Sequence, residues 1–136
     1  MRRILGLFAL VVFASPVSGQ VVFEIIACSV KDVESEEYMS FNYLDVARET
    51  ARMIGNLGEE EVAVIARGTF LHLLEVTPQG SLMTMTVFTD APTSPADPET
   101  GAQSVSAVYS RHHSIFGEPF ASFWRGTCRL VPMPGR

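Results

Sequence analysis

The chain has 136 residues, of which 47% are hydrophobic, 10% aromatic and 18% charged. Ten Gly, eight Pro and two Cys exclude a collagen-like chain, a Pro/Gly low-complexity chain and a disulfide-dense miniprotein. The net charge of -5 disfavours a nucleic-acid partner, because phosphate backbones require a basic surface. The composition is that of one small globular domain.

Residues 1–19 have the pattern of a secretory signal peptide. Two arginines precede an apolar run at residues 4–14, and small residues follow as far as Gly19. The apolar run is shorter than the roughly twenty residues of a membrane-spanning helix. We therefore expect cleavage after Gly19, a mature β domain of residues 20–136, and a periplasmic or secreted location.

A second processing pattern follows the first. Residues 25–28, Ile-Ile-Ala-Cys, resemble the lipobox of bacterial lipoproteins, in which a small residue precedes a cysteine that becomes lipidated. In lipoproteins the box comes directly after the apolar run, whereas Gln20 and Glu24 intervene here. Cleavage after Gly19 is the favoured interpretation, and lipidation of Cys28 is the alternative.

The two cysteines, Cys28 and Cys128, lie near opposite ends of the mature domain. In an oxidising compartment we expect them to form a disulfide. The chain-entropy model gives a loop of about 100 residues a stabilisation of up to ~4.7 kcal/mol. Neither cysteine belongs to a C-x-x-C redox motif.

Alternation of apolar and polar residues with a period of two predicts β-strands through most of the mature chain. The alternating or β-branched runs are residues 21–33, 61–67, 69–77, 81–89, 104–110 and 120–130. Thr-Pro-Gln-Gly at residues 77–80 predicts a type I turn that joins two of these runs into a hairpin. The same alternation predicts an inward face that includes Phe70, Leu74, Met83, Met85, Val87, Trp124 and Cys128.

One stretch, residues 41–56, satisfies two periods. Tyr43, Val46 and Ala47 fit helical spacing behind an Asn42 N-cap, but the same residues also alternate as strands. The strand interpretation is favoured because the surrounding chain is β throughout, and a short helix is the alternative. Residues 90–103 contain three prolines and almost no apolar side chain, which predicts a surface loop.

These elements predict an all-β single domain. Strands that pair mostly with their sequence neighbours form a small antiparallel sandwich or open barrel. We expect about six to eight strands, with a short helix within 41–56 as the alternative.

The most polar cluster beside the β core is Arg111-His112-His113, which directly follows Tyr109. On a strand neighbouring side chains point to opposite faces, so His112 and His113 are poorly placed to chelate one metal together, whereas Arg111 and His113 share a face. Arg111 and His113 could instead hold an anionic group. We predict that Tyr109, Arg111, His112 and His113 form a binding site for an anionic or sugar-like ligand or for an unknown protein. A solvated strand end is the alternative.

His72 alternates with apolar residues, and we expect it on an apolar face with one hydrogen bond. A metal-dependent or hydrolytic enzyme would need His72 to meet His112 or His113 and a carboxylate. The sequence contains no G-x-S-x-G, H-E-x-x-H or Gly-rich phosphate-binding motif. We therefore expect a non-catalytic exported binding or envelope-associated domain without a cofactor, with the enzyme as the alternative.

The layout resembles that of lysozyme-inhibitor-like barrels of bacteria. The late Phe123-Trp124 pair and the single bridge between the ends carry the resemblance. Those inhibitors insert a loop with a Ser-Gly pair ahead of a Tyr, and Ser106-Ala107-Val108-Tyr109 lacks that glycine. The resemblance is one of layout and assigns no family.

Overall fold

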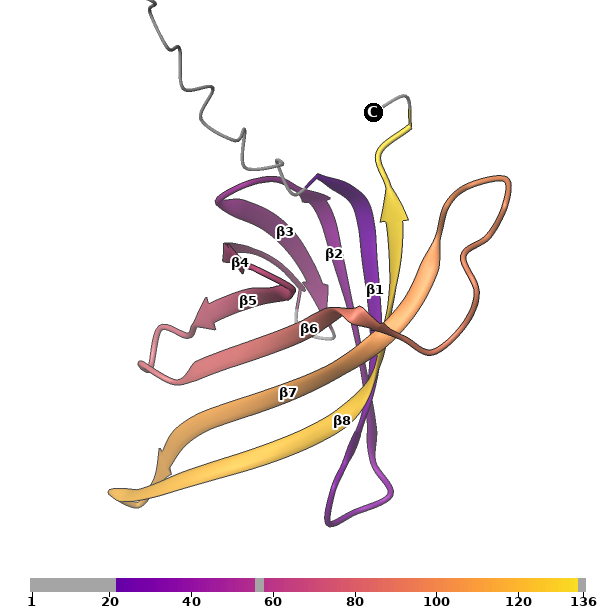
Figure 1. Ribbon diagram of the computed structural model, residues 1–136. Helices are drawn as coiled ribbons and strands as arrows, with labels where there is room; N and C mark the ends of the chain where they lie inside the picture. Colours follow the sequence, from indigo (N-terminus) through magenta and orange to yellow (C-terminus); the bar gives the residue numbers. More distant parts are fainter. Residues whose placement is uncertain (1–21, 56–57, 135–136) are drawn as a thin grey trace, which may run out of the picture.

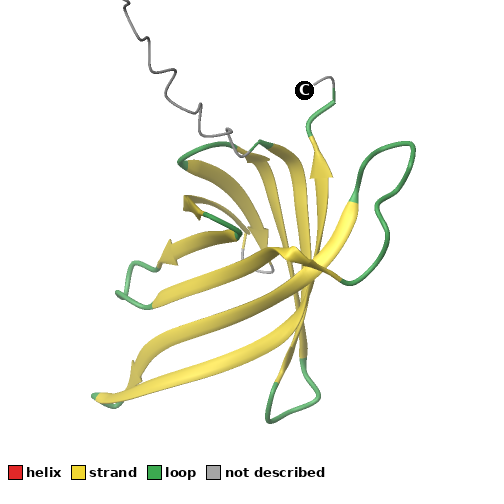
Figure 2. Ribbon diagram, viewed as in Figure 1, coloured by secondary structure: helices red, strands yellow, loops and turns green. Residues whose placement is uncertain are grey.

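A computed structural model describes residues 22–55 and 58–134 as one closed barrel of eight antiparallel strands (Figure 1). This confirms the predicted all-β class. The described part consists of strands and loops (Figure 2) and holds no helix long and apolar enough to cross a membrane. The proposed signal peptide, residues 1–19, lies outside the described residues. The strands are β1 (Phe23–Asp32), β2 (Tyr38–Val46), β3 (Thr50–Gly55), β4 (Gly58–Arg67), β5 (Phe70–Val76), β6 (Leu82–Pro92), β7 (Gln103–Ile115) and β8 (Glu118–Pro132).

Each strand pairs with its sequence neighbour, and β8 returns to pair with β1. The predicted hairpin at residues 77–80 is confirmed between β5 and β6. The Gly80 amide donates to the Thr77 carbonyl at 2.8 Å, and the Thr77 amide donates to the Ser81 carbonyl at 2.9 Å. Gly80 has a φ of 87°, which a glycine adopts without steric cost.

In the ambiguous stretch at residues 41–56, the described residues 41–55 form the end of β2 and the whole of β3, so the strand interpretation is confirmed. Asp45 has a φ of 50° and interrupts the alternation of β2. As a result Tyr43 and Val46 are both buried although they are three residues apart. That spacing also occurs on one face of a helix, which explains the double pattern in the sequence.

The barrel closes where β1 meets β8. Cys28 and Cys128 are directly paired across these strands and form the predicted disulfide, with Cα atoms 4.0 Å apart. Next to it, a Cβ added at Gly126 would overlap the Ser29 carbonyl and lie 2.8 Å from the Val30 Cα. Gly126 therefore permits the close approach of β1 that completes the barrel.

The predicted inward face is right in part. Met85, Val87, Trp124 and Cys128 are buried, and Met83 is partly buried against the same core. The assignment of Phe70 and Leu74 to this face is wrong, because Leu71 and Leu73 take the inward positions of β5. Both faces of β5 are apolar, so alternation alone could not distinguish them.

The two ends of the barrel differ, and we name them by their connections. The hairpin end carries the β1–β2, β5–β6 and β7–β8 turns, and the loop end carries residues 93–102 between β6 and β7. The predicted 90–103 loop is thus shorter than expected, because β6 continues to Pro92. At the hairpin end the β7–β8 ribbon extends beyond the neighbouring strands (Figure 1).

Candidate functional site

A cavity of about 520 Å³ lies inside the barrel at the hairpin end. Residues from β2 to β7 contribute to its wall, and the β5–β6 turn contributes to its edge. The lining residues are Met39, Ser40, Phe41, Met53, Gly55, Gly58, Glu60, Glu75, Thr77, Pro78, Gln79, Met83, Tyr109 and Arg111.

The deeper wall of the cavity is aromatic and sulfur-containing. The Phe41 and Tyr109 ring centroids lie 4.7 Å apart, and the Trp124 and Tyr109 ring centroids lie 5.2 Å apart. The Tyr109 hydroxyl donates to the Met83 sulfur at 2.8 Å. Burial raises the pKa of Tyr109 to about 12, so the phenol is a neutral donor at physiological pH.

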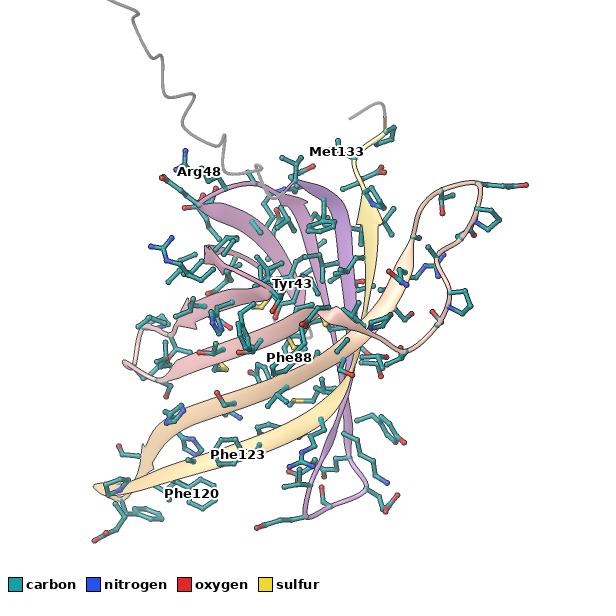
Figure 3. All side chains as sticks on the ribbon, viewed as in Figure 1. Tyr43, Arg48, Phe88, Phe120, Phe123 and Met133 are labelled. Carbon is teal, nitrogen blue, oxygen red and sulfur yellow. A yellow bond between two sulfur atoms is a disulfide. The ribbon has the colours of Figure 1, made fainter. Side chains whose placement is uncertain are left out.

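Beneath this wall Tyr43 reaches the middle of the barrel (Figure 3) and is 2% exposed. Burial, followed by the neighbouring Tyr109 and Glu75, raises the pKa of Tyr43 far above its ordinary value. The interior beneath the cavity is therefore uncharged, and apolar and methionine contacts fill the barrel below it.

The inward positions change from apolar to charged toward the hairpin end. On β5 the inward residues Leu71 and Leu73 are followed by Glu75, and on β7 Tyr109 is followed by Arg111. On β4 Glu60 lies on the mouth side of buried Val62. The cavity thus has an apolar body and a mouth with both signs of charge.

Two carboxylates, those of Glu75 and Glu60, lie close together on the acidic side of the mouth. Partial burial raises the pKa of Glu75, and the nearby Glu60 carboxylate raises it further, while Arg111 lowers it by a smaller amount. Glu75 therefore takes up a proton more readily than an ordinary glutamate. A molecule that covers the mouth would desolvate Glu75 further and leave Arg111 as the charged donor.

The two histidines lie beside this mouth. His112 and His113 line a second groove of about 390 Å³ with Ser114 and with the turn residues 79–81. The His113 ring contacts Phe120 edge-on at 5.1 Å, and its buried Nδ1 atom has no hydrogen-bond partner among the described residues. Of the four predicted binding residues, the structure places Tyr109 and Arg111 in the cavity and the two histidines in the adjacent groove.

His72 lies apart from both places. It is half-buried on the outer surface of β5, where Nδ1 is 2.9 Å from the Thr86 hydroxyl and the ring stacks near Phe70. The expected single hydrogen bond is present, but the position is the barrel exterior instead of the core. Among residues 22–55 and 58–134 no group of three or more His, Cys, Asp or Glu side chains is arranged to hold a metal ion.

Sequence reasoning missed the other half of the cavity, namely Met39, Phe41, Met53, Glu60 and Glu75 as lining residues. A signal for the mouth was present, because the inward face of three strands becomes charged at the same end. Recognising it required the correct face of β5, which the alternation did not provide.

Comparison of the chain with protein-family models, with curated proteins and with solved structures finds no match. The residues that line the cavity are therefore the guide to the kind of ligand that it could hold. Its apolar walls could enclose a hydrophobic body, and its mouth could anchor a polar end through Arg111, Gln79 and the two glutamates.

Proposed function

We propose that this protein is an exported, non-catalytic binding protein that holds a small amphiphilic molecule in the open end of its barrel. The observation that carries this proposal is the cavity of about 520 Å³, because small-molecule sites are typically concave, mostly apolar and equipped with a few convergent polar groups. Export is part of the proposal, supported by the signal-peptide pattern of residues 1–19 and by the disulfide.

The proposed ligand has an apolar body and an anionic or sugar-like end. Phe41, Tyr109 and three methionines offer polarizable walls for the body. Arg111 offers a planar, permanently charged fork for a carboxylate, phosphate or sulfonate group. Glu75, with its raised pKa, can be neutral beneath a bound ligand and donate a hydrogen bond to it.

Two dyes with the same apolar body test this proposal. N-phenylnaphthylamine is neutral, and anilinonaphthalene sulfonate adds one anionic group. We expect both to bind with a rise in dye fluorescence, the anionic dye more tightly, and Arg111→Ala to remove only the preference for the anionic dye. Trp124, the single tryptophan, lies next to Tyr109 and provides a second signal.

A matched pair of variants locates the binding. Gly55 lines the cavity, and a Cβ there would meet no atom within 4 Å, so Gly55→Phe should fill the mouth without strain in the fold. The control is Ile65→Phe, at an exposed position on β4 away from the cavity. We expect Gly55→Phe to weaken dye binding at least about tenfold and Ile65→Phe to leave it unchanged. Equal binding by the two variants would refute a site in this cavity.

A further inference from the structure

Exposed apolar side chains are concentrated at the hairpin end of the described chain. Only two of the large ones, Ile65 and Phe70, lie elsewhere. Soluble monomers rarely expose large contiguous apolar patches, and those that occur often mark an interaction site. The side chains at the hairpin end, which we call the apolar rim, are Val33, Tyr38, Ile54, Val76, Leu82, Ile115, Phe116, Phe120 and Phe123.

The tip of the β7–β8 hairpin is the most unusual part of this rim. Ile115 pairs with Glu118, so Phe116 and Gly117 form a two-residue turn with φ angles of 50° and 80°. Such a turn favours Asn or Gly at its first position, and a bulky residue there costs about 1–2 kcal/mol. Phe116 is also fully exposed. Neither the backbone nor the solvent favours phenylalanine here, which indicates a role for Phe116 outside the fold of its own chain.

The hairpin carries an aromatic side chain on each of its faces. His113 and Phe120 contact each other on the face that continues the barrel interior, whereas Phe123 lies on the opposite face between buried Trp124 and Ser122 in sequence. Figure 3 shows Phe120 and Phe123 on the part of β8 that extends from the barrel. A hairpin with an aromatic side chain on each face buries more apolar surface in a partner that contacts both faces than on a flat surface that contacts one.

Charge differs between the two hairpins that flank the β1–β8 seam. At this end the β7–β8 hairpin carries Arg111 at the cavity mouth, Arg125 opposite Lys31 of β1 and the two histidines, and its one acid is Glu118. The β1–β2 turn is acidic, with Asp32, Glu34, Glu36 and Glu37 against Lys31. Both project from the same end of the barrel (Figure 1). The two hairpins adjoin at their bases, where Asp32 pairs with Trp124, and their tips diverge (Figure 1). One end of the molecule therefore presents an aromatic ribbon with two arginines and a separate acidic ribbon.

We propose that the hairpin end binds a second copy of this chain in a two-fold symmetric dimer. In such a dimer the same patch serves both partners, so a basic aromatic hairpin on each copy can lie against the acidic hairpin and mouth of the other. Both faces of the β7–β8 hairpin, including Phe116 and Phe120, would then be covered by the partner. The dimer would also cover the cavity mouth, but the proposal does not depend on a ligand.

A second copy fits these charges better than a lipid bilayer does. An anionic bilayer would attract Arg111 and Arg125 but repel Glu118 and the acidic β1–β2 turn at the same end. A second copy offers both signs of charge in the required places. Opposite patches that face each other also suppress incorrect arrangements.

Sedimentation velocity of the disulfide-bonded protein, from low micromolar to several hundred micromolar, tests the proposal. We expect a monomer–dimer equilibrium that Phe116→Asn weakens at least about tenfold. Because Asn suits the turn, this variant should melt at the same temperature as the wild type or higher, which separates lost association from lost folding. Phe70→Asn, an exposed aromatic outside the rim, is the control and should leave the dimer constant unchanged.

The charge arm of the experiment uses Glu34→Lys with Glu37→Lys. We expect this pair to weaken the dimer, while Glu99→Lys at the loop end has no effect.

A wild type that stays monomeric at every concentration would overturn the proposal, as would a dimer whose dissociation constant Phe116→Asn does not change. Vesicles of phosphatidylethanolamine and phosphatidylglycerol form the last arm, and a monomer that binds them through Phe116 would assign the rim to lipid instead.

Discussion

The loop end and the hairpin end of the barrel differ in how well their side chains and backbone groups are satisfied by the fold. At the loop end residues 93–102 fold back on themselves, because Asp97 accepts hydrogen bonds from the Glu99 amide at 2.8 Å and the Thr100 amide at 3.2 Å. The Asp97 amide in turn donates to the Ala102 carbonyl at 2.7 Å, and Ala102 is buried. At the hairpin end apolar side chains are exposed, charged groups point inward and a cavity remains.

This difference indicates where the barrel is optimised for stability and where it is not. The middle and the seam are densely packed, with Val30, Met85, Val87 and Cys128 completely buried. The hairpin end instead holds a strained phenylalanine, a glutamate with a raised pKa and a histidine nitrogen without a partner. Departures of this kind from local stability tend to cluster at functional sites.

The largest expected effect comes from two identical substitutions of glycine. Gly126→Ala should lower the free energy of unfolding by more than about 3 kcal/mol, because the new methyl group meets the backbone of β1. Gly55→Ala meets no atom within 4 Å at the hairpin end and should change stability by less than about 0.5 kcal/mol. Denaturant unfolding measures both. Similar costs for the two variants would contradict the contrast between seam and mouth.

A smaller difference is expected between two inward apolar residues. Leu73 is 2% exposed, and Leu73→Ala should cost about 2–5 kcal/mol because it leaves a cavity in a closed core. Met83 already borders open space, so Met83→Ala should cost only about 1 kcal/mol. The comparison is made by thermal and denaturant unfolding at one pH. A Met83→Ala cost equal to that of Leu73→Ala would show that the cavity is not open to solvent.

The smallest effect is a pair of opposite pH dependences. The raised pKa of Glu75 means that the folded state holds a proton that the unfolded chain has lost, so stability falls as pH rises from about 4 through the folded pKa. Glu75→Gln should therefore become more stable than the wild type in that window, by about 0.5 kcal/mol after allowance for solvent screening.

Asp97 should behave in the opposite sense. Backbone hydrogen bonds from Glu99 and Thr100 lower its pKa, so its stabilisation is present at neutral pH and is lost as pH falls through the folded pKa. Asp97→Ala should thus be less stable than the wild type at pH 7, and the difference should shrink on acidification. Unfolding curves across pH 3 to 8 check both variants, and slopes of the same sign would refute the assignment.

The strands could be predicted because their residues follow the period of a pleated chain. The runs at 61–67 and 104–110 correspond to β4 and β7, and the turn at 77–80 has a composition that specifies it. Where the pattern was ambiguous or gave the wrong face, the cause was local. Asp45 interrupts the alternation of β2, and the two apolar faces of β5 hide its orientation.

The candidate site could be predicted only in part, because it forms when distant strands close into a ring. Arg111 and Tyr109 stood out as polar and aromatic neighbours on one strand. Glu75 joins Arg111 through the register of β5, β6 and β7, in which Met83 pairs with both residues, and Met39 and Met53 reach the same cavity from β2 and β3. No local pattern encodes these pairings. His72 lies on the outer face of β5 beside Thr86, whereas His112 pairs with Leu82 nearer the hairpin end, so the two rings belong to different places.

The bridge between Cys28 and Cys128 joins the first strand to the last, which converts the linear chain into a covalent ring of eight strands. A single proteolytic cut in any turn or loop would open that ring without separating the two pieces. The cut chain would have new ends but keep every pairing between strands, as a circular permutant does. The disulfide thus keeps the two pieces in one molecule after a single cleavage, in addition to stabilising the fold.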